Sequence, residues 1–398
     1  RLTRDLALVL FPKLYNGSAT FGLNIYAFHH LAVGEYGVAS FCLTSLQVMD
    51  GLFGSAFDVA VTRKLHENPD TPIPHSITAI ERTAIVSKLL VGFIFTTILL
   101  VAGEAIANKL FHRPGDGVTL SVVVAAATCI LLVRSIQLAF QLRFQFLPYG
   151  LADIIQTTLR ILFVVIGFTS GSANALWLIS SFGLAGLITA LLFFQFAKKT
   201  GLSNWTGGPL LLQELWNRCK TLLLTSGLGS VLNRLDMIIL GIVSNTQQLG
   251  MFGAALAIAI IPEILATYTS PVLLPRILPS RTDGTLKKLF LSVNSLFYAS
   301  ALVALLSVWL IPDSLFFLIF PPRYADSIGV LRFLLPGLLA SASLLPLSLN
   351  LLLLIKPRIM LYIDLATAPL LIGCYFFFGE AYGAIGVALS LTGIRTLK

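Results

Sequence analysis

A run of 37 residues without a single charged side chain, from Ile161 to Ala197, most constrains how this chain can fold. As one α-helix the run would reach about 55 Å at 1.5 Å per residue, far beyond the roughly 30 Å hydrocarbon core of a bilayer. It therefore has to fold back on itself, and the polar stretch 169–174 is where we expect the turn. The run predicts two helices that cross a membrane in opposite directions.

Composition supports the same conclusion for the whole chain. Hydrophobic residues make up 56% of the sequence and charged residues only 11%, against about 25% charged residues in an ordinary soluble domain. A soluble chain so poor in charge could not cover its own surface, whereas a spanning helix needs about 20 mostly apolar residues. The sequence therefore predicts an all-α, polytopic membrane protein with room for about twelve transmembrane helices.

Twelve spans are predicted when the same test is applied along the chain, with a second fold-back at the polar stretch 244–248. The predicted spans are 6–30, 36–61, 80–103, 118–142, 148–169, 174–197, 216–243, 248–275, 288–311, 328–353, 358–378 and 382–398. Near the end, 14 uncharged residues lie between Glu380 and Arg395, and we expect the last helix to be cut short.

The net charge of +9 indicates topology rather than nucleic-acid binding, because the basic residues are spread over many loops instead of one patch. With the N-terminus in the cytoplasm, the outer loops hold only Lys109, Arg113 and Arg323, and the inner loops hold most of the other basic residues. Cytoplasmic loops typically carry such an excess. We therefore predict a multi-pass protein of the cell inner membrane whose N-terminus is cytoplasmic.

The second half of the chain repeats features of the first at an offset of 213 residues, which aligns Gly37 with Gly250 and Asp50 with Glu263. Six helices per half is an even number, so the halves keep one orientation, as in transporters with a substrate path between two parallel lobes. We predict an N-terminal six-helix lobe at 1–200, a cytoplasmic basic linker at 201–215 and a C-terminal six-helix lobe at 216–398.

Charged residues inside the predicted spans are the candidates for function, because a charge at the bilayer centre costs about 2.5–3.5 kcal/mol. They are Lys13, Asp50, Asp58, Arg134, Asp153, Arg160, Arg234, Asp236, Glu263 and Asp364.

Arg234 and Asp236 lie two residues apart in the seventh predicted helix, hence about 200° apart around its axis, and are not expected to pair with each other. Arg234 has two interpretations, a phosphate contact or one half of an ion pair between helices. Lys13 and Arg160 would add to a cationic cavity if both face the lobe interface, and otherwise would snorkel to the headgroups.

The remaining charges have simpler interpretations. We expect Arg134 to snorkel to the headgroups. We expect the acids that the repeat relates, Asp50 and Glu263, to anchor neighbouring helices rather than to relay protons.

Motifs for catalysis are missing from the sequence. It holds no G-x-x-x-x-G-K-[ST] phosphate loop, no H-E-x-x-H and no recognisable Ser-His-Asp or Cys-His set. The four cysteines are far apart and have no metal-binding spacing. We predict no enzyme activity, catalytic residue, metal or cofactor. Any energy input would then come from an ion gradient, the membrane potential or the substrate's own gradient.

Four short segments carry a resemblance to a known family. Residues 232–241 read LNRLDMIILG, residues 249–255 read LGMFGAA, residues 34–39 read GEYGVA, and residues 381–388 read AYGAIGVA. In order and spacing they resemble bacterial polysaccharide flippases, of the lipid-linked oligosaccharide or O-antigen type, in the multidrug/oligosaccharidyl-lipid/polysaccharide exporter superfamily. One departure is the pair His29 and His30, where many relatives have an arginine before the first-lobe turn.

The resemblance implies two lobes that work by alternating access and move an undecaprenyl-diphosphate-linked oligosaccharide to the outer leaflet for cell-surface polysaccharide, such as the O-antigen of lipopolysaccharide. By this similarity the predicted substrate-binding residues are Arg234, Lys13, Arg160 and Asp236. The expected partners are the lipid-linked oligosaccharide, the lipid bilayer, a coupling ion (proton or sodium), and a polysaccharide polymerase with its export machinery.

Three alternatives stay open. A multidrug exporter would share the fold, but the cationic bias within the spans favours an anionic substrate. A membrane-embedded polysaccharide polymerase or glycosyltransferase usually needs a sizeable outer loop or a cytoplasmic catalytic domain, and the predicted loops are short. A non-transporting assembly scaffold is also compatible with the sequence.

Overall fold

The computed structural model describes residues 2–55, 77–111, 117–142, 145–197, 227–264, 313–344 and 357–397, together with short pieces between 224 and 310. Every regular element in these ranges is a helix, which confirms the all-α fold. Asp58, the predicted linker 201–215 and most of the predicted span 288–311 lie outside the described residues. The count of twelve helices and the boundaries of the two predicted lobes therefore stay predictions.

Helices in the first half of the chain follow the predicted spans. They are α1 (Leu2–His30), α2 (Val33–Met49), the π-helix η1 (Asp50–Ser55) that continues α2, α4 (Ile77–Phe111), α5 (Gly117–Leu142), α6 (Phe146–Thr169) and α7 (Ala175–Ala197). The turn predicted at 169–174 is confirmed between α6 and α7. Gly171 in this turn has a φ of 87°, a left-handed conformation that glycine adopts without steric cost.

Helices in the second half are described in part. They are α9 (Leu235–Val243), α10 (Thr246–Ala259), α13 (Asp313–Phe316), the 3-10 helix η3 (Pro322–Tyr324), α14 (Asp326–Leu344) and α16 (Pro357–Leu397). The fold-back predicted at 244–248 is confirmed, since α9 ends at Val243 and the Asn245 side chain caps α10 by accepting from the Gln248 backbone N–H at 2.9 Å.

The element α16 is two helices joined at a kink. Gly383 lies at the kink with φ 59° and ψ −135°. The Ser390 hydroxyl donates to the Cys374 carbonyl at 3.3 Å, although a continuous helix would separate these residues by about 24 Å. The chain therefore reverses near Gly383, as the predicted spans 358–378 and 382–398 require.

The chain divides into two compact units, and the division cuts across α1 and α2. The first unit comprises Arg1–Thr20 with Cys42–Arg234, and the second comprises Phe21–Phe41 with Leu235–Lys398. Each of the first two helices therefore contributes one part to either unit.

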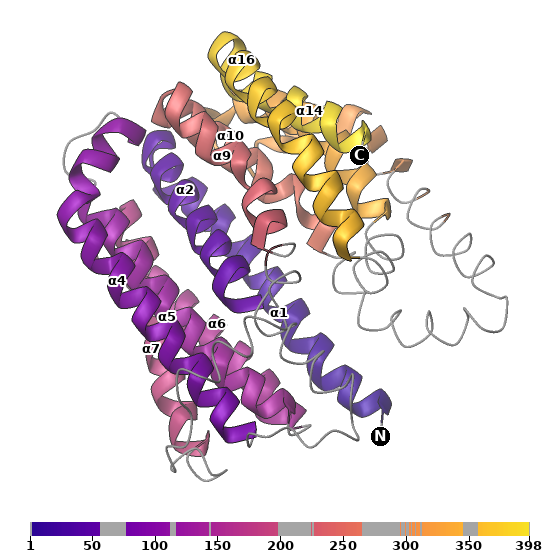
Figure 1. Ribbon diagram of the computed structural model, residues 1–398. Coiled ribbons are helices and arrows are strands. Elements are labelled where there is room, and N and C mark those ends of the chain that lie inside the picture. The colour runs from indigo at the N-terminus through magenta and orange to yellow at the C-terminus, as the bar shows by residue number, and fades with distance from the viewer. Residues whose placement is uncertain are drawn as a thin grey trace, which may run out of the picture. The chain divides into compact units, whose positions relative to one another are not determined.

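In the first unit α5 packs against α4, α6 and α7, and α6 also packs on α7 (Figure 1). Small residues allow the closest approach, because Gly183 and Gly186 of α7 face Ala126 and Cys129 of α5. Such contacts are typical of membrane helices, whose association depends on close packing rather than on the hydrophobic effect. An apolar core of α5, α6 and α7 is made of Val133, Ile136, Phe140, Ala152, Ala190 and Phe193.

In the second unit α2 and α10 meet along a line that we call the glycine seam, formed by Val33, Gly37 and Ser40 of α2 and Thr246, Gly250 and Gly253 of α10. A Cβ atom added to Gly37 would collide with the Thr246 carbonyl oxygen, and one added to Gly250 would collide with the Val33 carbonyl oxygen. The two collisions are equivalent: Gly37 meets the backbone of Thr246, and Gly250 meets that of Val33. In both cases the α10 residue lies 213 positions after its α2 counterpart, because 33 corresponds to 246 and 37 to 250. The geometry of the seam thus agrees with the offset of the predicted repeat.

A second contact in this unit, the Arg323 clasp, joins η3 to the end of α1. The Arg323 guanidinium donates to the carbonyls of Phe28 and His29, both at 2.8 Å, and the Tyr324 hydroxyl donates to the Leu31 carbonyl at 3.2 Å. Burial raises the pKa of Tyr324, and the nearby Arg323 charge only partly opposes this, so the hydroxyl remains a donor at neutral pH. A cation at a helix C-terminus is also favoured by the helix dipole.

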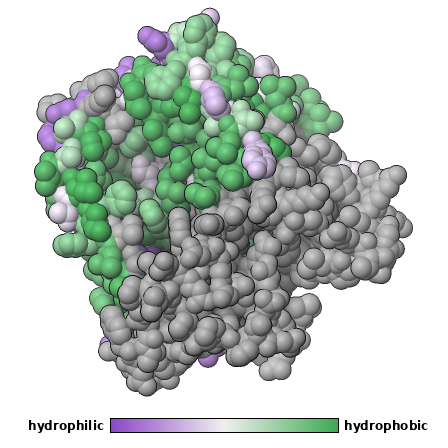
Figure 2. Space-filling model, in the orientation of Figure 1, coloured by the Kyte–Doolittle hydropathy of each residue, from purple (hydrophilic) through white to green (hydrophobic). Residues whose placement is uncertain are grey.

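Five described helical segments are long and apolar enough to cross a membrane: Lys88–Asn108, Gly117–Gln141, Phe146–Thr169, Ala175–Gln195 and Leu361–Leu397. Their outer faces are apolar, as the exposed side chains of Phe93, Val101 and Leu191 illustrate. Figure 2 shows this as a largely hydrophobic surface over the described helices in view. In water such a surface would be unfavourable, and in lipid it is the expected one.

Candidate functional site

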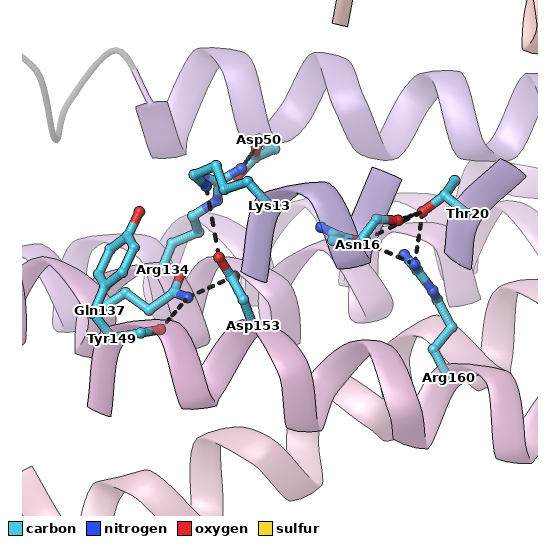
Figure 3. A network of polar contacts seen from close by, with 9 residues as sticks. All are labelled: Lys13, Asn16, Thr20, Asp50, Arg134, Gln137, Tyr149, Asp153 and Arg160. Carbon is cyan, nitrogen blue, oxygen red and sulfur yellow. Dashed lines mark hydrogen bonds and ion pairs between the residues drawn. The ribbon is translucent and has the colours of Figure 1, made fainter. Parts of the chain in front are cut away.

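A network of polar contacts joins nine residues on helices of the first unit (Figure 3). We call it the polar network, and it consists of Lys13, Asn16, Thr20, Asp50, Arg134, Gln137, Tyr149, Asp153 and Arg160. Its members come from α1, η1, α5 and α6. On α1 they recur at spacings of three and four residues, which places them on one helix face.

A close approach of α6 to α1 brings the two helices into hydrogen-bonding range. Pro12 has no N–H, so the Leu8 carbonyl lacks the bond that a helix normally provides four residues later. Gly150 of α6 packs at this point, where a Cβ atom would lie 2.5 Å from the Leu8 carbonyl oxygen. Lys13 follows Pro12 directly and Asp153 lies one turn beyond Gly150, so the backbone contact places their side chains opposite each other.

Lys13 and Asp153 form an open ion pair. The Lys13 Nζ lies 3.6 Å from Asp153 Oδ2, beyond the roughly 2.7–2.9 Å of a strong charge-assisted hydrogen bond. The other carboxylate oxygen, Oδ1, accepts a bond of 2.7 Å from the Gln137 amide, which also reaches the Tyr149 carbonyl at 3.4 Å. In the part of the chain that is described, no hydrogen-bond donor reaches Asp153 Oδ2, although this atom is buried.

Arg160 joins α6 to α1 through neutral groups. Its Nη2 donates to Asn16 Oδ1 at 3.0 Å and to Thr20 Oγ1 at 2.7 Å. The guanidinium also lies over the Phe182 ring of α7, 4.6 Å from the ring centroid. The hydrogen bonds and the ring hold the guanidinium on the α1 side of α6 without neutralising its charge themselves.

Arg134 and Asp50 form a closed ion pair of 2.8 Å between α5 and η1. The expectation that Arg134 snorkels to the headgroups was therefore wrong, because a carboxylate on the neighbouring element offers a better partner than the distant membrane surface. The π-helix helps to admit the acid, since Gly54 leaves space where a Cβ atom would lie 2.6 Å from Asp50 Oδ1. The anchoring role predicted for Asp50 agrees with this geometry.

The acid that the repeat relates to Asp50 is also paired, but with a different helix. Glu263 accepts a bond of 3.0 Å from Arg395 of α16 in the second unit, and Ser341 accepts from the same guanidinium nitrogen. Asp50 pairs with α5 of its own unit instead. The two halves thus share the position of the acid and differ in the source of the arginine.

The other two predicted site residues, Arg234 and Asp236, are not members of the polar network. The prediction of one continuous helix for the seventh span was wrong. Asn233 and Arg234 form a turn between helical residues 227–232 and α9. The angle of 200° expected between the side chains therefore does not apply. Asp236 is buried in the first turn of α9, where its Oδ1 accepts from the Met237 backbone N–H at 2.7 Å.

Four members of the network, Asn16, Thr20, Gln137 and Tyr149, are uncharged, so the cost of charge in lipid did not single them out in the sequence. Asn16 and Thr20 lie three and seven positions after Lys13, and Tyr149 lies four before Asp153. A search for polar residues at helical spacing from each buried charge would have identified these three. The nine residues include three basic and two acidic side chains, so the network carries a formal charge of +1 and favours an anionic ligand.

Solved structures of transporters share this fold. An inward-facing multidrug resistance MATE family transporter of the MOP superfamily is 13% identical over 98% of this chain and 95% of its own, with a TM-score of 0.68. The lipid II flippase MurJ in an inward closed conformation is 14% identical over 97% and 84%, with a TM-score of 0.73. The chain therefore has the fold of these transporters.

The family of the chain is shown by its sequence. The model of a family described as polysaccharide biosynthesis protein matches residues 2–279, about two thirds of the chain. The chain belongs to this polysaccharide biosynthesis family, as its flippase-like motifs predicted. No curated protein matches the chain by sequence.

Proposed function

We propose that this protein is a flippase that moves an undecaprenyl-diphosphate-linked oligosaccharide from the inner to the outer leaflet of the cell inner membrane by alternating access. The observation that carries the proposal is the polar network, in which Arg134 and Arg160 lie on helices apolar enough to span a membrane and Lys13 lies beside Asp153 of one of them. A diphosphate is the anionic part of such a lipid, and Lys and Arg side chains are the groups that bind phosphate best.

Each predicted residue has a place in this proposal. Lys13 and Arg160 bind the diphosphate from α1 and α6. Arg234 binds a phosphate or an acidic sugar from the turn before α9, where a broken helix frees backbone groups. Asp236 lies in the first turn of α9, and we assign it to the substrate path with Arg234. The N-terminus is cytoplasmic, and a proton or sodium gradient drives the cycle.

A multidrug exporter is the nearest alternative, because the MATE transporter has the same fold. Two observations favour the lipid-linked glycan over a cationic drug: the family match and the positive formal charge of the network. A polymerase that consumes the flipped lipid would be a partner of this protein rather than its own activity.

Deletion of the gene tests the function, with the sidedness of the lipid-linked glycan as the measurement. The expected result is accumulation of the lipid-linked glycan on the cytoplasmic leaflet. A plasmid copy of the gene should abolish this accumulation. Unpolymerised repeat units on the outer leaflet would overturn the proposal and support a polymerase. Unchanged glycan together with greater drug sensitivity would support the multidrug exporter.

Arg234→Ala tests the proposed substrate contact. We expect export to stop while the variant remains in the membrane at the wild-type level, because the guanidinium binds cargo rather than holding helices together. Arg332→Gln is the matched control, since Arg332 pairs with the exposed Asp313 outside the network. Full export by Arg234→Ala would leave Arg234 a structural residue only.

A further inference from the structure

We infer that Thr20 is a positioning residue for the cargo site: together with Asn16, its hydroxyl holds the Arg160 guanidinium in the orientation in which it binds the diphosphate. The inference rests on the proposed function, which assigns Arg160 to the diphosphate and gives Thr20 no role. It predicts that the affinity for the diphosphate depends on a neutral side chain of α1 that acts only through Arg160.

The first argument is the geometry of the contact between α1 and α6. One guanidinium nitrogen, Nη2 of Arg160, donates to Thr20 Oγ1 at 2.7 Å and to Asn16 Oδ1 at 3.0 Å. The two acceptors lie one turn apart on α1, whereas Arg160 belongs to α6. Two acceptors restrict the rotation of the guanidinium more than a single one would, because hydrogen bonds are directional. Residues of α1 therefore fix the end of a side chain that is otherwise long and rich in rotamers.

The second argument is that the Thr20 hydroxyl is itself oriented. It donates to the Asn16 backbone carbonyl at 2.7 Å, while the Asn16 side-chain oxygen is farther away at 3.3 Å. A hydroxyl has one proton, so this bond leaves its lone pairs to accept from Arg160. The backbone of α1, rather than another mobile side chain, thus sets the direction of the contact.

The third argument is charge. Thr20 and Asn16 are neutral, so they orient the guanidinium without adding a negative charge that would compete with a phosphate. The Phe182 ring of α7 lies with its centroid 4.6 Å from the guanidinium carbon, and it also restrains the group without a formal charge. The two restraints reduce the rotamer freedom that Arg160 would otherwise lose on binding an anion, which is a cost of association.

The experiment measures binding of polyprenyl diphosphate to the purified protein in nanodiscs, with neutral polyprenol of equal length as the control lipid. The test variant is Thr20→Val, which keeps the shape of the side chain and removes the hydroxyl, and Thr20→Ser restores a hydroxyl. Asn16→Leu removes the second acceptor, and it replaces Thr20→Val in every comparison if that variant does not fold. The melting temperature of each variant verifies its folding.

Tyr15→Phe is the matched control. It removes another hydrogen bond between α1 and α6, the contact of 3.0 Å between the Tyr15 and Thr158 hydroxyls, which does not involve Arg160. A second control places Thr20→Val in an Arg160→Gln background. A residue that acts through Arg160 has nothing left to position in that background, so the two substitutions should not be additive.

We expect Thr20→Val to bind the diphosphate about threefold to tenfold more weakly, because the released guanidinium must then be ordered by the lipid itself. Thr20→Ser should recover most of the affinity, and Tyr15→Phe should bind like the wild type. In the Arg160→Gln background, Thr20→Val should cause no further loss. Binding of neutral polyprenol should change in none of these variants.

Wild-type affinity in a folded Thr20→Val protein would overturn the inference. A similar loss in Tyr15→Phe would overturn it as well, since the effect would then belong to the contact between the helices in general, and so would a loss that persists in the Arg160→Gln background. Failure of the proposed function gives a different result. The wild type would then bind the diphosphate no better than polyprenol, or Arg160→Gln would leave its preference for the diphosphate unchanged.

Discussion

The glycine seam and the polar network join helices by opposite means. In the seam α2 and α10 touch through backbone atoms, and its residues Ser40 and Thr246 are each less than 9% exposed. In the network α1, α5 and α6 are linked by long charged side chains, and Lys13 and Arg134 keep about a third of their side-chain surface exposed.

The difference shows where each unit can accommodate change. Backbone contact tolerates no added atom, because neither partner can rotate away. Charged side chains on flexible stems can exchange partners at modest cost. Substitutions should therefore affect stability more at the seam than in the network.

The largest expected effect is at the seam. Gly37→Ala should lower the stability by about 2–3 kcal/mol, because the new methyl group would displace backbone atoms of α10. Gly22→Ala in α1 is the matched control, since no atom lies within 4 Å of its added Cβ. Alanine is the better helix former, so the control should be unchanged or more stable by up to about 1 kcal/mol. Thermal unfolding in detergent measures both, and equal melting temperatures would show that the seam is not tight.

The closed ion pair of the network should come next. Arg134→Met leaves the Asp50 carboxylate in an apolar setting, and we expect a loss of roughly 2 kcal/mol. The loss is smaller than for a fully buried pair because both side chains are partly exposed. The double variant Arg134→Met with Asp50→Leu should recover most of the stability. If the single variant unfolds at the wild-type temperature, the ion pair is solvated and contributes nothing to stability. The difference in stability between the seam and the network would then be larger than expected.

A smaller effect is expected at the Arg323 clasp. Arg323→Gln removes charge-assisted bonds to the carbonyls of Phe28 and His29, which should cost about 1–2 kcal/mol. Tyr324→Phe keeps the aromatic packing and loses only the bond to Leu31, so its cost should be about 1 kcal/mol or less. A larger loss for the tyrosine variant than for the arginine variant would reverse this order. Chemical denaturation of the two proteins gives the comparison.

The smallest effect is expected for an ion pair on the surface. Arg332 contacts Asp313 at 2.7 Å, but the Asp313 side chain is 60% exposed. Asp313→Asn should change the stability by less than about 1 kcal/mol, because water and salt screen such pairs. A loss as large as that of Arg134→Met would show that a short distance alone, without burial, determines the strength of pairs in this protein.

The order of helices could be predicted from the sequence because the bilayer sets their length. The uncharged run from Ile161 to Ala197 had to turn, and it turns at Gly171 as expected. Breaks within a span were harder to foresee. The turn at Asn233 and Arg234 and the π-helix that begins at Asp50 both lie inside predicted spans, and the spacing of apolar residues does not distinguish them from continuous α-helix.

The candidate site was predictable only as a set of residues. Lys13 and Arg160 were selected because charge is costly in lipid, and both belong to the network. Their partners could not be derived, because Asp153 and Asn16 meet them only through the packing of α6 on α1. The wrong prediction for Arg134 has the same cause, because its partner Asp50 lies 84 residues away in sequence.

By itself, the sequence determined that this protein lies in a lipid bilayer rather than in water. Long uncharged runs are stable in lipid, where they must form helices that satisfy their own backbone hydrogen bonds. It also determined which few charges need an explanation. The tertiary structure alone decided which partners those charges meet, such as Asp50 beside Arg134 and Asp153 beside Lys13. The physical reason is that pairing depends on differences of less than an ångström between helices, and hydropathy contains no such information.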